Sequence, residues 1–292
     1  MTDGARTGLH HVEVGAADLD RSEEFYRSTL GLGAVPGAPA TASERWLDAG
    51  TALVRLVHVP AGDLGGWQVV NHQRGFRHAG FTVGDVDAWA PRLSAAGVGF
   101  TIAPMTALGD VRIVFFQDPD GALVELVSRP LRYTSVWDEE EVAAQRRRGH
   151  REPGDDALRL DHAATTVADL GSALALYGDD LGLGRLGQVP HPGDERGYVR
   201  SYLAAGEGVL EVFSYDVPPL PPAALDVPRR GLRAVALTTA DPDAAAAAVL
   251  ARGGRELPGD LPGGPAGGPG RLLADADGTV LRLLPPGWSP AP

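Results

Sequence analysis

Histidine, aspartate and glutamate are the residues through which this chain could hold a metal ion. It contains 8 His and 38 Asp and Glu residues, but neither Cys nor Lys. Without cysteine, disulfides, zinc fingers, iron–sulfur clusters and thiol catalysis are excluded. Without lysine, Schiff-base chemistry through that side chain is excluded as well. Any bound metal must therefore be held by imidazole nitrogens and carboxylate oxygens.

Two of the histidines occupy equivalent positions in an internal repeat. The segment GLHHVEVGAADLDRSEEFYRSTLGLG begins at Gly8, and RLDHAATTVADLGSALALYGDDLGLG begins at Arg159. Aligned without a gap, they place His11 on His162, Tyr26 on Tyr177 and one LGLG on the other. So many coincidences at one offset predict a duplicated domain.

The elements that must position these residues follow one pattern, which is a strand, a helix and then further strands. In the first half we expect strands at 9–15, within 45–59, and at 76–83, 99–102, 111–116 and 122–128, with helices at 19–30 (capped by Asp18) and 86–96. The second half repeats this plan, so the sequence predicts an α+β fold with four βαβββ modules. We expect a first domain at 1–130, a linker at 131–156 and a second domain at 157–292. Within the linker, DEEEVAAQRRR (138–148) predicts a short exposed helix, a solvated connector with acids at its start and arginines at its end.

The strings LHHVEV, DLDRSEEFY and LGLG, followed by FRHAGFTV and FFQDPDGALVELV, resemble the vicinal oxygen chelate (VOC) superfamily. It includes glyoxalase I, methylmalonyl-CoA epimerase, extradiol dioxygenases and bleomycin resistance proteins. The resemblance covers nearly the whole chain and implies two tandem glyoxalase-like domains whose mixed sheets form cups, the second domain being partly degenerate. It also implies a divalent metal inside a cup built from two modules. The fold hosts many reactions, so it does not by itself fix the chemistry.

The resemblance places ligands on the first and last strands of the paired modules. These positions hold His11, Arg55, His78 and Glu125 in the first half, and His162, Glu211, Ala234 and Arg282 in the second. If each half closes on itself, one site has three ligand residues and an arginine, and the other has two ligand residues and an arginine. If the halves pair crosswise, as the two chains of glyoxalase-like dimers do, His78, Glu125, His162 and Glu211 form one complete set.

We favour the crosswise set because an arginine beside a metal ion is costly. Two unit charges 4 Å apart repel by about 4 kcal/mol at an effective dielectric constant near 20. Crosswise pairing collects Arg55 and Arg282 in the other cup, where Glu13 could neutralise both. Two alternatives stay open at this point: a triad of His11, His78 and Glu125, with His11 as the first-strand ligand, and no metal at all.

Two imidazoles and two carboxylates suit one divalent ion, which could be Ni, Co, Mn, Zn or Fe(II). Such an ion can bind two neighbouring substrate oxygens and stabilise an enediolate, while Glu125 or Glu211 moves the proton. This describes a lyase, isomerase or epimerase acting on a small molecule. The alternatives are an Fe(II)-dependent extradiol dioxygenase and a non-catalytic protein that binds an antibiotic or another small molecule.

Composition narrows the partners. The 292 residues carry a net charge of −12, which argues against nucleic acid and against anionic membrane surfaces. No apolar run is long enough to span a bilayer, and no signal peptide is recognised before Leu9. We therefore expect a cytoplasmic protein whose partner is a small-molecule substrate, either a monomer with two pseudo-dimeric halves or a homodimer.

Overall fold

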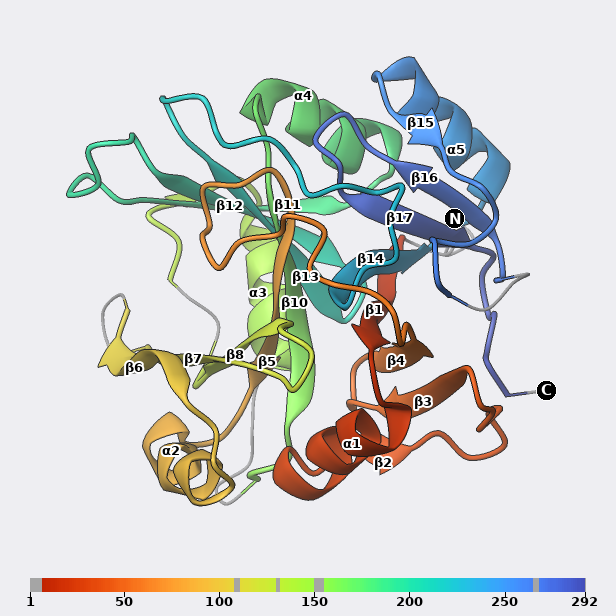
Figure 1. The fold of residues 1–292 in the computed structure, drawn as a ribbon. Helices are drawn as coiled ribbons and strands as arrows, with labels where there is room; N and C mark the ends of the chain where they lie inside the picture. Colours follow the sequence, from red (N-terminus) through yellow and green to blue (C-terminus); the bar gives the residue numbers. More distant parts are fainter. Residues whose placement is uncertain (1–6, 108–110, 130–131, 150–154, 265–267, 292) are drawn as a thin grey trace.

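The first half of the chain contains two modules that each run strand, helix, strands (Figure 1). The computed structural model describes residues 7–107, 111–129, 132–149, 155–264 and 268–291. The first module consists of β1 (Gly8–Ala16), α1 (Leu19–Glu24), the π-helical turn η1 (Phe25–Thr29), β2 (Gly33–Ala34), β3 (Glu44–Asp48) and β4 (Leu53–His58). The second consists of β5 (Gly75–Thr82), α2 (Val86–Ala95), β6 (Phe100–Thr106), β7 (Arg112–Gln117) and β8 (Leu123–Val127).

The second half repeats this order after a connecting segment. That segment holds β9 (Ser135–Val136) and α3 (Glu139–Arg148). The third module consists of β10 (Arg159–Thr166), α4 (Leu170–Leu174), the π-helical turn η2 (Ala175–Asp180), β11 (Gly184–Pro190), β12 (Val199–Ala205) and β13 (Gly208–Ser214). The fourth consists of β14 (Gly231–Thr238), α5 (Pro242–Ala251), β15 (Arg255–Glu256), β16 (Arg271–Ala274) and β17 (Val280–Leu284). None of the described helices is long and apolar enough to cross a membrane.

Aspartate caps explain where the helices begin. The Asp18 carboxylate accepts hydrogen bonds from two backbone N–H groups in the first turn of α1, as the sequence predicted. Asp85 and Asp241 cap α2 and α5 in the same way, and Asp169 accepts one such hydrogen bond, from the Ser172 N–H, at the start of α4. The helix expected at 19–30 is α-helical only to Glu24 and continues as η1.

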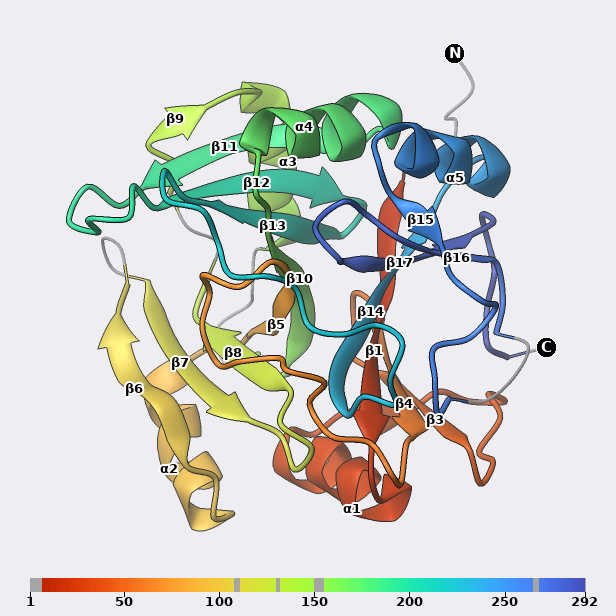
Figure 2. The ribbon, with the colours of Figure 1, turned by 45° about the horizontal axis from the view of Figure 1, so that its top comes forward.

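The two sheets are each shared between the halves. One has the strand order β15-β16-β17-β14-β1-β4-β3-β2, and the other β6-β7-β8-β5-β10-β13-β12-β11-β9. The joins are antiparallel pairs, β1 with β14 and β5 with β10. Figure 2 shows the red β1 beside the blue-green β14, and β5 beside β10, although the two strands of each pair belong to different halves of the chain. Modules therefore combine crosswise, first with fourth and second with third.

Contacts between a helix and a turn tie together the two modules of each half. In the first half, the Tyr26 hydroxyl donates to Asp118 Oδ2 at 3.0 Å, and the other oxygen of Asp118 accepts from the backbone N–H groups of Asp120 and Ala122. In the second half, the Tyr177 hydroxyl donates to Asp275 at 2.5 Å. Burial raises the pKa of Asp118 to about 7. The turn at 118–121 is therefore also an anchor for the first helix.

The prediction of a solvated connector is wrong for one face of the linker. The acidic first turn and basic last turn of α3 are as expected. However, Val142 and Gln145 are buried, β9 pairs with the edge strand β11, and the Tyr133 ring packs on the Tyr202 ring at 5.1 Å. The charge pattern of the linker describes only its exposed face. The opposite face packs against the β11 edge of the second sheet.

The buried Asp118 predicts a pH dependence of stability. Its pKa is higher in the folded chain, about 7, than in the unfolded chain, so the folded state retains a proton that the unfolded state releases. This contribution is complete below pH 4 and is lost as the pH rises through 7. We expect the free energy of unfolding to fall less steeply between pH 5 and 7.5 in Asp118→Asn than in the wild type, measured by urea denaturation with a chelator present.

Asp87→Asn is the matched control. The hydrogen bond from Arg112 lowers the pKa of this exposed carboxyl, so it is ionised throughout the window and its variant should keep the wild-type slope. Equal slopes for Asp118→Asn and the wild type would contradict the prediction.

Candidate metal centre

The nine-stranded sheet brings four ligand-type side chains to one place through its register. His78 on β5 lies opposite Ala164 on β10, which lies opposite Glu211 on β13. In the neighbouring row, His162 on β10 lies opposite Gly80 on β5, and Gly80 lies beside Glu125 on β8. The two rows are related by a local twofold arrangement that exchanges the second and third modules. Each module thus supplies one histidine and one glutamate.

The four side chains converge on one point and are all buried. The Nε2 atoms of His78 and His162 lie 3.0 Å apart. Glu125 Oε2 lies 3.3 Å from the first of these nitrogens and 3.0 Å from the second. Glu211 Oε2 lies 3.3 and 3.5 Å from them. One ligand atom from each residue lies within 4.8 Å of all the others, so this group could hold a metal ion.

The two histidines are fixed in different ways. Nδ1 of His162 lies 2.9 Å from Asp161 Oδ2, and a Cβ atom on Gly80 would overlap the His162 ring, so only glycine leaves room for it. His78 instead packs edge-on against Phe115 and Phe213, with ring centroids 5.2 and 5.7 Å away. Its Nδ1 is buried with no hydrogen-bond partner among the described residues.

Electrostatic coupling holds the cluster in a charged state. Burial lowers the pKa of His162, but Asp161, Glu125 and Glu211 together raise it well above its usual value. Burial likewise raises the pKa of Glu125 and Glu211, but the two histidines lower both, helped at Glu211 by Arg200. The site therefore presents two carboxylates that stay ionised and that the positive charge of His162 and Arg200 stabilises.

This donor set fits a divalent cation. When the Nδ1–H group of a neutral His162 donates a hydrogen bond to Asp161, the lone pair of its Nε2 points into the cluster. Nε2 of His78 and the two carboxylates point to the same place. Two imidazoles and two carboxylates are borderline and hard ligands that suit first-row divalent ions. Their role as metal ligands remains a prediction at this point.

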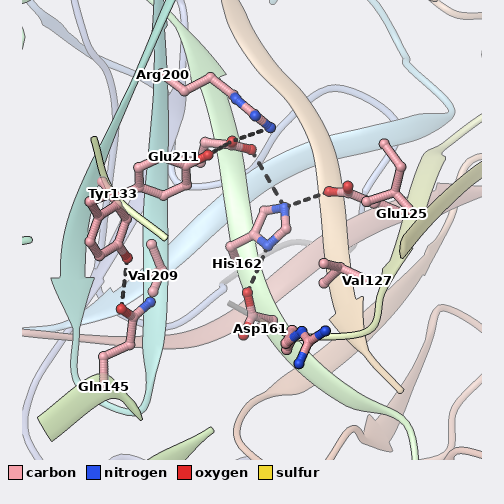
Figure 3. Close-up of a pocket in the computed structure, with 12 residues that line it drawn as sticks. Glu125, Val127, Tyr133, Gln145, Asp161, His162, Arg200, Val209 and Glu211 are labelled. Carbon is pink, nitrogen blue, oxygen red and sulfur yellow. Dashed lines mark hydrogen bonds and ion pairs between the residues drawn. The ribbon is translucent and has the colours of Figure 1, made fainter. Parts of the chain in front are cut away.

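A pocket beside the cluster has one wall that sequence reasoning missed (Figure 3). Tyr133 and Gln145, from the linker, form one wall and are hydrogen-bonded to each other at 2.7 Å. Tyr202 donates to Glu211 Oε1 at 2.7 Å, and Arg200 Nη1 lies 3.7 Å from the same oxygen. Strand alternation could have placed Arg200 and Tyr202 on one face. Nothing in the sequence places the linker wall.

The eight-stranded sheet holds the other four positions, His11, Arg55, Ala234 and Arg282. His11 is therefore remote from the four-residue cluster, and the alternative triad with His78 and Glu125 is not assembled. Burial, His10 and the two nearby arginines lower the pKa of His11 well below its usual value.

Glu13 neutralises this second cup, as expected from its position two residues after His11. Its Oε2 lies 3.0 Å from Arg55 Nη1 and 3.5 Å from Arg282 Nη2, and its Oε1 lies 3.2 Å from Arg233 Nε, a contact the sequence did not indicate. Arg55 also pairs with Glu44 at 2.7 Å. Burial alone would raise the pKa of Glu13, but the three arginines lower it by more than burial raises it, so the carboxylate stays ionised. An ion-pair cluster thus fills the place that a metal would take.

Comparison with known proteins agrees with this architecture. A family model for the glyoxalase/bleomycin resistance protein/dioxygenase superfamily matches residues 8–126 and 159–283. A probable lactoylglutathione lyase of Vibrio cholerae is 27% identical over 127 residues, which are 40% of this chain and 87% of that protein. Among solved structures, glyoxalase I from Zea mays is similar with a TM-score of 0.67 at 22% identity, over 96% of this chain and 92% of that one. A putative dioxygenase from Bacillus subtilis gives a TM-score of 0.59 at 15% identity, over 98% and 87% of the two chains. These structural likenesses show the fold and confirm the tandem architecture.

The second cup predicts a strong dependence of stability on Glu13. Its side chain is 3% exposed, and its removal leaves three buried guanidinium groups without their shared carboxylate. Breaking one partner out of a buried ion-pair network costs about 3–5 kcal/mol. We expect Glu13→Gln to lower the free energy of unfolding by that amount, measured by urea denaturation.

Glu256→Gln serves as the control, because the Arg271–Glu256 pair lies at the surface and such pairs contribute about 0–1 kcal/mol. If Glu13→Gln costs no more than this control, the ion-pair cluster does not stabilise the second cup.

Proposed function

Because this chain belongs to the glyoxalase/bleomycin resistance protein/dioxygenase superfamily, we propose that it is a divalent-metal-dependent enzyme acting on a small molecule with two neighbouring oxygen atoms. One observation carries the proposal: two histidines and two glutamates, one pair from each half, converge in a buried cluster. A second cup on the same scaffold has lost this set, which argues that the first is retained for use.

His78, Glu125, His162 and Glu211 would hold the ion, with Ni, Co, Mn, Zn and Fe(II) all compatible with such ligands. When bound, a divalent ion supplies Lewis acidity, which stabilises the negative charge of an enediolate formed next to a carbonyl. The protein's own part is to orient the substrate in the pocket and to move a proton. This describes a lyase, isomerase or epimerase.

We assign the proton transfer to Glu125 rather than to Glu211. Glu211 is restrained by the Tyr202 hydroxyl and by Arg200. Within the described part of the chain, Glu125 forms ion pairs only with the two histidines. A carboxylate with fewer restraints can leave the ligand set and reach a substrate C–H bond at lower cost.

The ring-cleaving dioxygenase alternative is less well supported. That chemistry uses an Fe(II) site with three protein ligands and open positions for the substrate and dioxygen. Here a fourth ligand-type residue, Glu211, lies in the cluster. Dioxygen consumption with a catechol would favour this alternative, and its absence would favour proton transfer. A protein that only binds an antibiotic or another small molecule would need no ligand set of this kind.

Metal binding should depend on His162. We expect about one equivalent of divalent metal per chain after metal-replete purification. His162→Ala should weaken metal affinity at least tenfold, because it removes one ligand from a chelating set. The measurement is a competition titration against a chelating dye, together with elemental analysis.

His11→Ala is the matched control, since His11 occupies the repeat-equivalent position in the other cup and should leave the affinity unchanged. Two equivalents of metal per chain, no metal at all, or a loss at His11 with none at His162 would each refute the proposed site.

Proton transfer should depend on Glu125. We expect the metal-loaded enzyme to exchange the hydrogen next to a carbonyl for solvent deuterium in some member of a panel of α-hydroxycarbonyl compounds, followed by NMR in D₂O. Glu125→Gln should slow this exchange by about 10²–10⁴-fold, as expected for the loss of a general base. Glu211→Gln should be affected less. If the larger loss falls on Glu211, the two glutamates have the opposite roles.

A further inference from the structure

An irregularity in β10 places an acidic side chain where strand alternation would not. Residues adjacent along a strand normally point to opposite faces of the sheet. The pairing of β10 with β5 shifts register between Leu160 and His162, which leaves Asp161 as the extra residue of a β-bulge. The bulge turns the Asp161 carboxylate toward the ring of its own neighbour, and Oδ2 lies 2.9 Å from His162 Nδ1. Figure 3 shows Asp161 on one side of the ring and the two glutamates on the other.

The other cup contains the same bulge with a different residue in it. The pairing of β1 with β14 shifts register between Leu9 and His11, so His10 occupies the place of Asp161. Nδ1 of His10 lies 2.8 Å from Nδ1 of His11. The bulge is thus common to both cups, but only the cup that contains the four-residue cluster has a carboxylate in it.

A neutral histidine can bind a metal through Nε2 only if its proton resides on Nδ1. A carboxylate that accepts a hydrogen bond from this N–H group selects that tautomer, fixes the ring plane and makes Nε2 a better electron donor. No second acceptor for His162 Nδ1 is found among the described residues. Gly80 leaves space for the ring but cannot choose its protonated nitrogen.

We propose that Asp161 is a positioning residue that holds the proton on His162 Nδ1 and so directs Nε2 into the metal site. The inference rests on the metal-dependent function proposed above and adds a residue to it that does not touch the ion. The β-bulge is needed for this role, because in a regular strand the Asp161 carboxylate would lie on the opposite face of the sheet, away from His162.

Metal affinity provides the first test, with Asp161→Ala and Asp161→Asn compared in full-length protein. Alanine removes the acceptor, and we expect metal affinity, titrated with Co²⁺ or Zn²⁺, to fall about 10–100-fold, the usual effect of losing such a partner. Asparagine keeps an acceptor oxygen but no charge, so its affinity should lie between those of alanine and the wild type. His10→Ala, the repeat-equivalent change, should bind metal as the wild type does.

Nitrogen NMR supplies a second readout that needs neither metal nor substrate. The Nδ1 proton of His162, identified by its loss in His162→Ala, should give a resonance protected from solvent exchange in the metal-free wild type. This resonance should disappear in Asp161→Ala while the unfolding temperature stays near the wild-type value.

The two tests separate this inference from the proposed function. A wild type that binds no metal but shows the protected Nδ1 proton refutes the metal site and leaves the hydrogen bond in place. A wild type that binds metal, with Asp161→Ala binding equally well or His10→Ala losing as much, refutes the role of Asp161.

Discussion

Antiparallel pairing between strands of opposite halves is the constraint on which the rest of this structure depends. β5 pairs with β10, and β1 pairs with β14. Without the first pairing, His78 and Glu125 would belong to one partial sheet and His162 and Glu211 to another. The register at the join then decides which side chains meet, because a slip of one residue would send every one of them to the opposite face. A few backbone hydrogen bonds thus determine the composition of a four-residue cluster.

The two cups have the same backbone arrangement but neutralise their buried charges differently. In one, two carboxylates face two imidazoles, and this group could hold a metal ion. In the other, Glu13 lies among the guanidinium groups of Arg55, Arg233 and Arg282, and the positive charge is neutralised by the protein itself. Both arrangements satisfy the rule that buried charge needs a partner. The difference is that the second cup is neutralised by arginines of the chain, whereas the proposed function gives the first cup an ion from solution.

Much of this arrangement could be predicted from the sequence, because the repeat aligns His11 with His162 and the two arginines mark the cup that has lost its ligands. Even the neutralising role of Glu13 follows from strand alternation. The bulge at Asp161 could not be predicted, since alternation assigns that residue to the wrong face. The linker wall of Tyr133 and Gln145 was missed for a different reason: the charges of α3 describe its exposed side and hide a buried stripe of only two residues. The contact of Arg233 with Glu13 was missed because Arg233 is the extra residue where the pairing of β14 with β1 shifts register, so alternation from Ala234 assigns it to the wrong face.

The crosswise sheets also have a consequence for how the chain is made. When the ribosome has released only the first half, β1 and β5 are both present, but their partners β14 and β10 have not been synthesised. Each nascent chain therefore carries two unpaired strand edges, the feature that natural proteins usually shield from solvent. The β10 and β14 strands of a second, completed chain could occupy these edges, giving an intertwined dimer with the same strand pairings as the monomer. The proportion of monomer and dimer would then depend on two rates: the rate at which the second half is translated and the rate at which the nascent chain meets another copy. The second rate rises with the expression level, so the outcome would depend on expression level as well as on sequence.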